Sequence, residues 1–497
     1  MLPLFLREYA VITGFIIIGS FIFRFFFNDR IFLRWGLLLF LVITALYCSR
    51  NFFLFTAILF VLVRKFVPKK PSIECLSYYF LLLPLVPENF AQKIPLPGLQ
   101  QLFTLSYPLM LNIFILLPIF LNVFPYIKRT IFSQRCDKYI IIYLVYVFFL
   151  GFRDTTLTDA FRSGFYLFLG PFMLYFVVSR TISRAEDFAK LFKPMIFVAF
   201  ILALMGIFNT IKGWNMYEAL EFISEILATK RVGYLRRLGV LRAQASFSHP
   251  ISFGTYLTLM IGFMMFLKDS FYEKKTQFHL VIGTLFFSML FTLSRGPLLG
   301  FAVFFFIFII LMKQKAFKFT PIILALAFAF LFSPISNITL STLPFVGERQ
   351  QRTVEYRKKL WVNSIKVAKR SPLTGNNSYM EEPEIQELKK YGGVLITGGV
   401  DIVSSYLLIL LQHGLIGLCL FLLIFLKLLF GILKAFFSTR DETLSLLGKM
   451  LFSITAATLV MMATVTYQSS YYLWCLFGFC AVYLQIIKGE SRFLSRT

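Results

Sequence analysis

Long apolar runs separated by short polar stretches dominate the sequence. The runs are about 15–22 residues long, and a helix of that length spans a hydrocarbon core of roughly 30 Å. They predict transmembrane helices at 9–28, 34–48, 51–66, 74–87, 103–125, 138–152, 163–179, 193–211, 251–267, 278–293, 296–312, 319–333, 415–436, 447–466 and 469–487. Because several early runs are short and 74–87 is expected only to enter the bilayer, we predict about 12–15 transmembrane helices.

The composition supports this interpretation. Of the 497 residues, 58% are hydrophobic and 15% are charged, and 64 are phenylalanine. A soluble domain is nearer half apolar and a quarter charged, and surface-to-volume scaling does not allow a soluble fold to bury this much apolar chain. A soluble enzyme, a coiled coil and a disordered protein are therefore excluded. The predicted fold class is an all-α, polytopic bundle of membrane helices.

The formal net charge of +26 lies in short loops between the apolar runs. Such a distribution encodes membrane topology, and it places the more basic set of alternate loops, with the C-terminus, in the cytoplasm. It does not form the single basic face of a nucleic-acid-binding protein. The flanks of the first run predict no cleavable signal peptide. The six cysteines have neither a disulfide-framework pattern nor zinc-ligand spacing, so no metal is predicted.

Two long polar segments interrupt the apolar pattern, and the charge rule places both outside the cytoplasm. Both are rich in lysine and arginine, which suggests an anionic ligand. The predicted divisions are 1–190 (N-terminal transmembrane helices), 191–334 (core helices with the periplasmic segment 212–250), 335–402 (a large helical periplasmic loop) and 403–497 (C-terminal helices and a cytoplasmic tail).

The second segment has internal order. Residues 348–370 are predicted to form an amphipathic helix with Val354, Trp361 and Ile365 at helical spacing and basic residues on the other faces. Ser371-Pro372 ends this helix, and a shorter one begins near Pro383. A folded subdomain that faces the membrane is therefore expected, with a solvated helical hairpin without a ligand as the alternative.

Three stretches place candidate chemistry at the ends of predicted spans. The first, LRAQASFSHPISFGTY from Leu241 to Tyr256, contains Arg242 and His249; the second, TLSRGPLLG from Thr292 to Gly300, is a tight turn containing Arg295. The third runs from Arg352 through Trp361 to SPLTG at 371–375, then to DIVSSYLL at 401–408 and HGLIG at 413–417. An arginine this close to hydrocarbon is costly unless it faces a wet cavity or an anionic partner.

Each stretch also has a simpler interpretation. Interfacial arginines often only extend to lipid phosphates, and glycine or proline at a span junction by itself indicates a turn. Several arginines that converge on one face are more specific, because a guanidinium group binds phosphate oxygens in bidentate fashion. We therefore expect them to meet in one pocket that binds a phosphate-bearing ligand.

The order of these motifs resembles a known family. The Arg…Ser-Phe-Ser-His-Pro…Phe-Gly-Thr-Tyr-Leu element, the Leu-Ser-Arg-Gly turn and the loop Arg…Leu-Trp…Ser-Pro-Leu-Thr-Gly are similar to the O-antigen ligases and polysaccharide polymerases, the WaaL/Wzy-type membrane glycosyltransferases. The resemblance covers roughly residues 190–435. The prolines of PLVPE at 84–88, IPLPG at 94–98 and LSYP at 105–108 resemble the exopolysaccharide-locus branch of that family.

The resemblance implies a metal-independent, GT-C-like enzyme without a cofactor, on the periplasmic face of a bacterial inner membrane. Its partners would be a polyprenyl-diphosphate-linked oligosaccharide as donor, a glycan or lipid as acceptor, and membrane lipids, with no nucleic acid. Family arginines hold the donor diphosphate, and this role carries over to Arg242 and Arg295, and further to Arg352 and Arg357. His249, Trp361 and Ser404 are further candidates for binding the substrate.

The acceptor hydroxyl also needs a base. Many ligases have a His-Asn pair just before the helix that follows the large loop, but this sequence has Ser404-Ser405 there, which favours a polymerase. His413 lies further along and is expected to pack inside that helix. Asp401 is the best-placed carboxylate to accept the proton; an ion pair with a catalytic arginine is the alternative, and Glu348 and Glu355 are the other candidates.

The predicted function is therefore a glycosyltransferase that joins polyprenyl-diphosphate-linked oligosaccharides, polymerising repeat units of a surface polysaccharide or exopolysaccharide. A ligase that transfers glycan to a lipid or protein is one alternative. A flippase or other carrier for lipid-linked oligosaccharides is an alternative of another class. Carriers usually show internal repeats and ionisable residues near mid-membrane, whereas here the predicted spans, apart from Arg24, are almost free of charge.

Overall fold

The fold was analysed in a computed structural model that describes residues 2–49, 51–70, 72–96, 99–124, 136–153, 156–222, 235–237, 239–268, 275–312, 347–391, 399–467 and 470–494. In this part of the chain, eight helices are long and apolar enough to cross a membrane: Leu4–Phe27, Ile31–Ser49, Leu157–Thr181, Ala185–Lys212, Arg295–Met312, Ser405–Ser438, Glu442–Met461 and Tyr471–Gly489. The predicted polytopic helical membrane fold is confirmed.

Several other predicted spans correspond to shorter apolar helices. The predicted spans 51–66, 74–87, 138–152, 251–267 and 278–293 overlap α3 (Phe52–Phe66), α4 (Ile73–Leu82), α8 (Asp137–Leu150), α13 (Pro250–Phe266) and α14 (Lys275–Phe291). The predicted span 319–333 lies outside the described residues.

The chain forms two compact units, and the four divisions expected from the sequence remain predictions. Unit 1 comprises Met1–Thr130 and Met173–Ser294, and unit 2 comprises Ile131–Phe172 and Arg295–Thr497. Besides α3, α4, α13 and α14, unit 1 contains α1 (Leu2–Phe27), α2 (Ile31–Ser49), β1 (Ala91–Leu96), β2 (Leu99–Ser106), α5 (Tyr107–Leu111), η1 (Asn112–Leu116), α6 (Leu117–Val123), α10 (Met173–Thr181), α11 (Ala185–Lys212), η4 (Glu218–Phe222), β3 (Arg236–Arg237) and β4 (Val240–Leu241). Besides α8, unit 2 contains α9 (Leu157–Leu167), η3 (Phe168–Phe172), α15 (Arg295–Met312), α18 (Gly347–Ala368), η7 (Tyr379–Glu381), α19 (Pro383–Glu387), η8 (Leu388–Tyr391), α20 (Ser405–Ser438), α21 (Glu442–Met461) and α22 (Tyr471–Leu494).

Helix α11 forms the centre of unit 1. It packs against α1, α4, α13 and α14, and most of its side chains are buried. Phe192 stacks on Phe263 of α13 with a centroid separation of 4.4 Å. The helix ends at Gly213, whose left-handed φ of 63° closes the last turn. It also contacts β4, the strand that directly precedes Arg242.

Residues 91–106 of unit 1 differ from the prediction, which began a transmembrane helix at residue 103. They form an antiparallel hairpin in which Ala91 pairs with Ser106 and Ile94 pairs with Phe103. The helical segment begins only at Tyr107, and Pro108 stands in its first turn. Cross-strand hydrogen bonds satisfy the backbone groups of the two strands. Helical periodicity does not reveal this antiparallel pairing.

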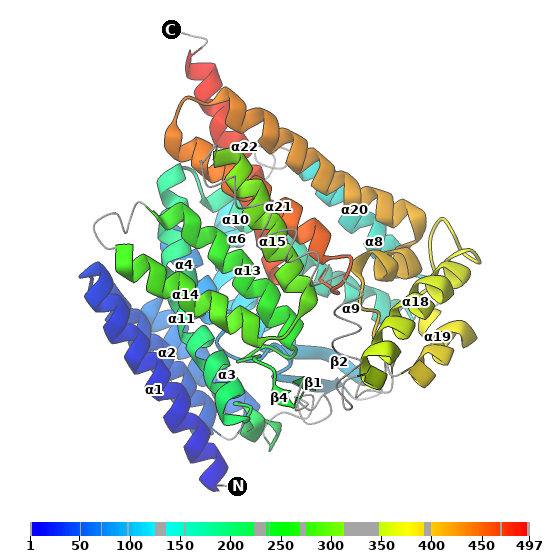
Figure 1. Ribbon diagram of the computed structural model, residues 1–497, viewed down its shortest axis with the longest axis horizontal. Helices are drawn as coiled ribbons and strands as arrows, with labels where there is room; N and C mark the ends of the chain where they lie inside the picture. Colours follow the sequence, from blue (N-terminus) through cyan, green and yellow to red (C-terminus); the bar gives the residue numbers. More distant parts are fainter. Residues whose placement is uncertain are drawn as a thin grey trace. The chain divides into compact units, whose positions relative to one another are not determined.

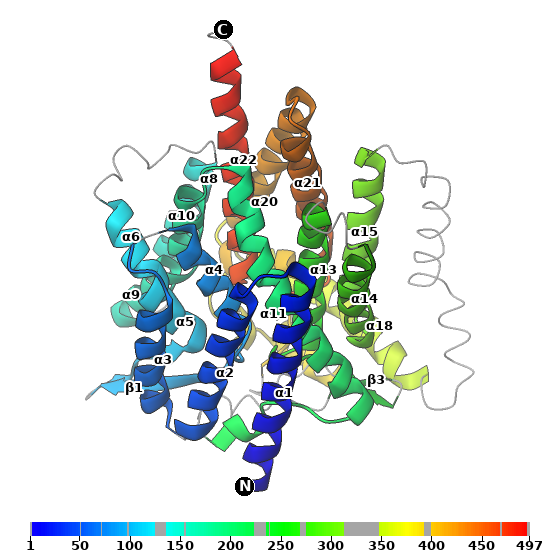
Figure 2. The same cartoon turned by 90° about the vertical axis from the view of Figure 1, so that its left-hand side faces the viewer.

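The spans of unit 1 are also less free of charge than the sequence suggested. Glu8 in α1 has no exposed surface. Its Oε2 accepts a hydrogen bond from Tyr47 Oη of α2 at 2.8 Å, and its Oε1 accepts one from the N–H of Ala219 in η4 at 3.0 Å. Figure 2 shows α1 and α2 side by side. One carboxyl group therefore joins three elements.

We expect Glu8→Ala to lower the thermal stability of the protein in detergent micelles. The substitution leaves two buried donors without an acceptor, and each such loss costs about 1–3 kcal/mol. Tyr47→Phe is the matched control, because it removes one of the two hydrogen bonds while the ring stays in place. The midpoint of thermal unfolding should therefore fall less in Tyr47→Phe than in Glu8→Ala. Equal midpoints for wild type and Glu8→Ala would contradict a structural role for this carboxyl.

In unit 2, α20 packs against α8, α21 and α22, and α15 packs against α21; Figure 1 shows α8 alongside α20. Two glycines bring α15 close to the end of α21 and to the residues that follow it. A Cβ at Gly296 would lie 2.6 Å from Thr464 Oγ1, and one at Gly300 would lie 2.2 Å from Met461 Cγ. Small residues four apart allow this close approach between membrane helices. The helix that begins with Arg295 is therefore tightly fixed.

Residues 347–391 form the predicted helical subdomain. Helix α18 spans Gly347–Ala368 and α19 begins at Pro383, as the sequence indicates. Its buried face is different from the predicted one: Tyr356, Leu360 and Val367 join an apolar cluster, whereas Trp361 and Ile365 are 44% and 41% exposed. The physical reason is that the cluster partners, such as Ile385, Val400 and Leu407, lie far along the chain.

Candidate functional site

In unit 1, Arg242 stands on a loop fixed from both sides. The N–H of Ala243 donates to the carbonyl oxygen of Phe291 at 2.9 Å, and the N–H of Ala245 donates to Asn209 Oδ1 at 3.2 Å. Asn209 Nδ2 also donates to the carbonyl oxygen of Trp214 at 2.8 Å. The end of α11 and the end of α14 therefore hold the backbone that carries Arg242.

The Arg242 guanidinium is held by the tight turn after α14. Its Nε donates to the carbonyl oxygen of Thr292 at 2.8 Å, and one terminal nitrogen donates to Ser294 Oγ at 2.7 Å. Among the described residues it forms no ion pair. Burial, and secondarily the charge of Arg237, lowers its pKa to about 10, so it stays protonated at neutral pH. Arg242 is thus a partly buried positive charge without an ion-pair partner in the part of the chain that the structure describes.

Backbone strain lies on both sides of this contact. Leu293 and Ala245 each have a φ of 48°, which side chains other than glycine rarely adopt. Arg237 donates to the Leu293 carbonyl oxygen, which fixes the strained residue. Strained residues of this kind cluster at binding and catalytic sites. The observation therefore points to the Leu-Ser-Arg-Gly turn as a functional element.

His249 is the N-cap of α13. Its Nδ1 accepts a hydrogen bond from the N–H of Ile251 at 3.1 Å, and Pro250 occupies the first helical position. Burial, and secondarily Arg242, lowers the pKa of His249 to about 4. The neutral ring therefore carries its proton on Nε2, where it can donate to an oxygen atom of a ligand.

In unit 2, Arg295, Arg357 and Asp401 come together. Arg295 is the first residue of α15, Arg357 lies on α18, and Asp401 precedes α20. Burial, and then the charge of Arg295, lowers the pKa of Arg357, whereas Asp401 raises it. Burial raises the pKa of Asp401, against the opposite effect of Arg357. Arg357 thus interacts electrostatically with both Arg295 and Asp401, and neither arginine forms an ion pair within 4.0 Å in the described part of the chain.

The backbone around Asp401 is anchored. Tyr356 Oη donates to the Asp401 carbonyl oxygen, one helical position before Arg357. Ser405 Oγ accepts from the N–H of Tyr467 at 2.7 Å and donates to the carbonyl oxygen of Val465 at 2.7 Å. The start of α20 is therefore tied to the segment after α21, and Tyr356 engages the carbonyl oxygen of Asp401 and not its carboxylate.

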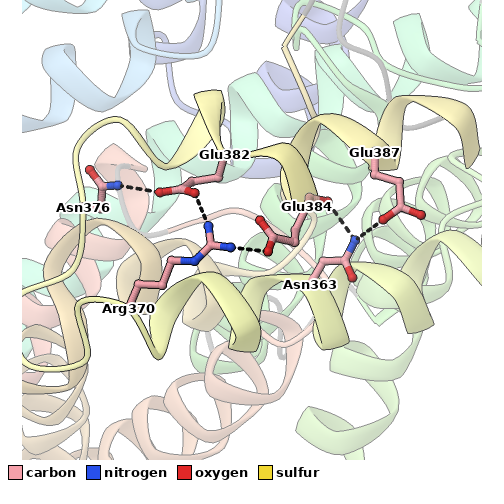
Figure 3. Close-up of polar contacts among 6 residues, drawn as sticks. All are labelled: Asn363, Arg370, Asn376, Glu382, Glu384 and Glu387. Carbon is pink, nitrogen blue, oxygen red and sulfur yellow. Dashed lines mark hydrogen bonds and ion pairs between the residues drawn. The ribbon is translucent and has the colours of Figure 1, made fainter.

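Figure 3 shows how the helical subdomain is held together. Arg370 forms ion pairs with Glu382 and Glu384, and Asn363 Nδ2 donates to the Glu384 carbonyl oxygen at 2.7 Å. Asn376 Nδ2 donates to Glu382 at 3.2 Å. Exposed ion pairs contribute little singly, but this network fixes the end of α18 against α19 and thereby the helix that carries Arg357.

The remaining predicted site residues are placed as follows. Trp361 is 44% exposed on α18, on the side away from the apolar cluster. Ser404 is the buried N-cap of α20, and its Oγ has no hydrogen-bond partner among the described residues. Arg352 lies in α18, but its side chain is outside the described residues. His413 lies inside α20 against Tyr143, as expected.

The structure thus forms two groups, Arg242 with His249 in unit 1 and Arg295 with Arg357 and Asp401 in unit 2. That all the arginines meet in one pocket stays a prediction. Sequence reasoning missed Arg237 and Tyr356, although both lie close in sequence to a predicted site residue. Among the described residues, no three His, Cys, Asp or Glu side chains gather in a group that could hold a metal ion.

The fold and these two groups define a polytopic α-helical membrane protein with arginines at the ends of its helices. Residues 280–422 match the family model described as O-antigen ligase (Wzy_C), and this match supports the predicted resemblance to the O-antigen ligase and polymerase superfamily. The matched region contains Arg295, Arg357 and Asp401. No curated protein matches the chain. The family acts on lipid-linked oligosaccharides and glycan acceptors, which supports a ligase- or polymerase-type membrane glycosyltransferase.

Proposed function

We propose that this protein joins polyprenyl-diphosphate-linked oligosaccharides on the periplasmic face of the bacterial inner membrane, polymerising repeat units of a surface polysaccharide or exopolysaccharide. The observation that carries the proposal is a set of partly buried arginines, Arg242, Arg295 and Arg357, that form no ion pair among the described residues. Partly buried guanidinium groups without an ion pair are suited to bind an anionic ligand. Their paired N–H donors can form bidentate hydrogen bonds to the oxygen atoms of a diphosphate.

The proposed reaction is a single displacement. The hydroxyl oxygen of the acceptor sugar attacks the anomeric carbon of the donor, and a new glycosidic bond forms as the bond to the diphosphate breaks. Polyprenyl diphosphate leaves with the bonding electrons, and the arginines stabilise its charge. The hydroxyl proton passes to the carboxylate of Asp401. His249 Nε2, Trp361 and Ser404 are proposed to orient the donor or the acceptor.

A ligase that transfers finished glycan to a lipid or protein is the second candidate, and the O-antigen ligase match favours it. Deletion of the gene separates the candidates. Accumulation of single lipid-linked repeat units supports the polymerase, whereas intact polymer left on its lipid carrier indicates the ligase. Repeat units trapped on the cytoplasmic face would instead indicate a flippase and overturn the enzyme proposal.

We expect the activity to persist when divalent cations are removed. In the proposed reaction, guanidinium groups stabilise the leaving diphosphate, so the step has no need of a metal ion. The measurement is glycan synthesis from lipid-linked repeat units by purified protein in proteoliposomes, with and without EDTA. Loss of synthesis that added Mg²⁺ or Mn²⁺ restores would contradict the proposed mechanism.

A further inference from the structure

Helix α20 of unit 2 is broken inside its apolar length. Gly414 has φ 66° and ψ −168°, so the two parts, Ser405–His413 and Leu415–Ser438, are separate helices joined at a glycine. A break leaves backbone N–H and C=O groups without helical partners. In a membrane helix such groups need partners from the protein. The residues that supply these hydrogen-bond partners therefore indicate the structural role of the break.

Residues 372–376, which we call the strap, supply these partners. The carbonyl oxygen of Pro372 accepts from the N–H of Leu415 at 2.8 Å, and that of Leu373 accepts from Ile416 at 3.2 Å. On the other side of the break, the N–H of Asn376 donates to the carbonyl oxygen of Leu411 at 2.7 Å. The strap thus replaces the missing helical hydrogen bonds of both parts of α20.

The strap and the break fit each other through two glycines. Gly375 has a φ of 73°, and a Cβ there would lie 2.5 Å from the Leu411 carbonyl oxygen. A Cβ at Gly414 would lie 2.3 Å from the carbonyl oxygen of Leu373. Only glycine fits either position, because both the backbone angle and the close approach exclude a side chain. The motifs Ser-Pro-Leu-Thr-Gly and His-Gly-Leu-Ile-Gly are therefore two halves of one contact.

Arg153, just after α8, fastens this contact. One terminal nitrogen donates to the carbonyl oxygen of Gly375 at 2.8 Å, and the other donates to that of Gln412 at 3.1 Å. The carbonyl oxygen of Arg153 accepts from Asn377 Nδ2 at 2.9 Å. Its guanidinium is thus occupied by the strap on one side and by α20 on the other.

We infer that Arg153 is a positioning residue that holds Arg357 and Asp401 in their working arrangement. The strap follows α18, which carries Arg357, and the first part of α20 follows Asp401. Because Arg153 fastens the strap to α20, it fixes the chain after α18 to the end of the first part of α20. The hydrogen bond from Tyr356 to the Asp401 carbonyl oxygen fixes α18 to the residues just before α20. The inference rests on the proposed function, in which Arg357 and Asp401 act on the substrate.

The test compares Arg153→Lys and Arg153→Ala with wild type in proteoliposomes that receive lipid-linked repeat units. Lysine reaches one of the two carbonyl oxygens and keeps the charge, so it should retain part of the activity. We expect kcat to fall at least about tenfold in Arg153→Ala with KM for the donor within about threefold, since misplacement by about 1 Å can cost on the order of 100-fold. Arg162→Ala is the matched control, because Arg162 lies on α9 of the same unit and pairs with Asp159; its activity should stay within about twofold.

Hydrogen exchange supplies a readout that is independent of activity. Peptides containing Asn376, Leu415 and Ile416 should exchange at least about tenfold faster in Arg153→Lys, while peptides from α11 stay unchanged. Faster exchange with wild-type kcat would overturn the inference, and so would unchanged exchange. If the wild-type protein itself shows no glycosyl transfer in this assay, the proposed function is contradicted instead. If Arg153→Ala does not fold, Arg153→Lys decides the question by both measurements.

Discussion

Arg295→Ala is expected to reduce polymer formation to background while the protein stays in the membrane. Arg295 begins a helix whose backbone is closely packed at Gly296 and Gly300, its charge lowers the pKa of Arg357, and it forms no ion pair among the described residues. Removing one such group that stabilises developing negative charge costs on the order of 10²–10³ in kcat. Arg295→Lys should also be poor, because a point charge cannot replace the bidentate fork.

The measurement is the yield of polymer per amount of membrane-inserted protein, followed by turnover of purified protein. Arg242→Ala should give the same loss, because Thr292 and Ser294 hold its guanidinium, which is also proposed to stabilise the leaving diphosphate. Arg440→Ala is the matched control, because Arg440 is exposed and lies outside both groups. Near-normal polymer from both Arg242→Ala and Arg295→Ala would refute the proposed role of the arginines in stabilising the diphosphate.

Asp401→Asn is expected to lower kcat by on the order of 10²–10⁴, the usual contribution of a general base. The carboxylate accepts the proton only when ionised. Burial raises its pKa above the ordinary value of about 3.9, and Arg357 opposes the shift. Wild-type activity should therefore fall as pH decreases through this raised pKa. The charged and titratable groups that interact with it are Arg357 and Tyr356, and Arg295 acts on Arg357.

The pH profile separates a base from an ion-pair partner. If Asp401 is the base, the Asp401→Asn variant should have a low kcat, and this kcat should no longer fall as the pH decreases. If it only pairs with Arg357, the variant should keep kcat and raise KM for the donor. Glu355→Gln is the matched control, since this exposed glutamate of α18 was the other described candidate. A larger loss from Glu355→Gln than from Asp401→Asn would transfer the role of base to Glu355.

The spans, α18 and the start of α19 could be predicted because their signals are local. Apolar runs, proline positions and helical periodicity act over a few residues, and they gave α18 to within two residues at its end. The buried face of α18 could not be predicted this way, because the side chains that cover Tyr356 and Leu360 come from residues 379–411. Trp361 and Ile365 have the same spacing and remain exposed.

The candidate site shows the same limit. Arg242 and Arg295 were recognisable because an arginine at a membrane boundary needs a partner. Arg153 has the same local context, yet its two acceptors lie 222 and 259 residues away, and only the folded chain reveals them. Glu8 was missed for the same reason, since its donor Ala219 lies 211 residues away. In the sequence, Gly414 looks like any other glycine, and only its backbone angles and the contacts with the strap show that it breaks α20.

The division of the chain also bears on how the protein is made. Residues 131–172 belong with 295–497, although unit 1 supplies the residues between them. During synthesis, α8 and α9 leave the ribosome well before α20, the helix against which α8 packs. The apolar surface of α8 therefore lacks its partner α20 while the rest of unit 1 is synthesised. Biogenesis of this protein therefore needs the insertion machinery or the surrounding lipid to shelter an early helical pair until translation has nearly finished.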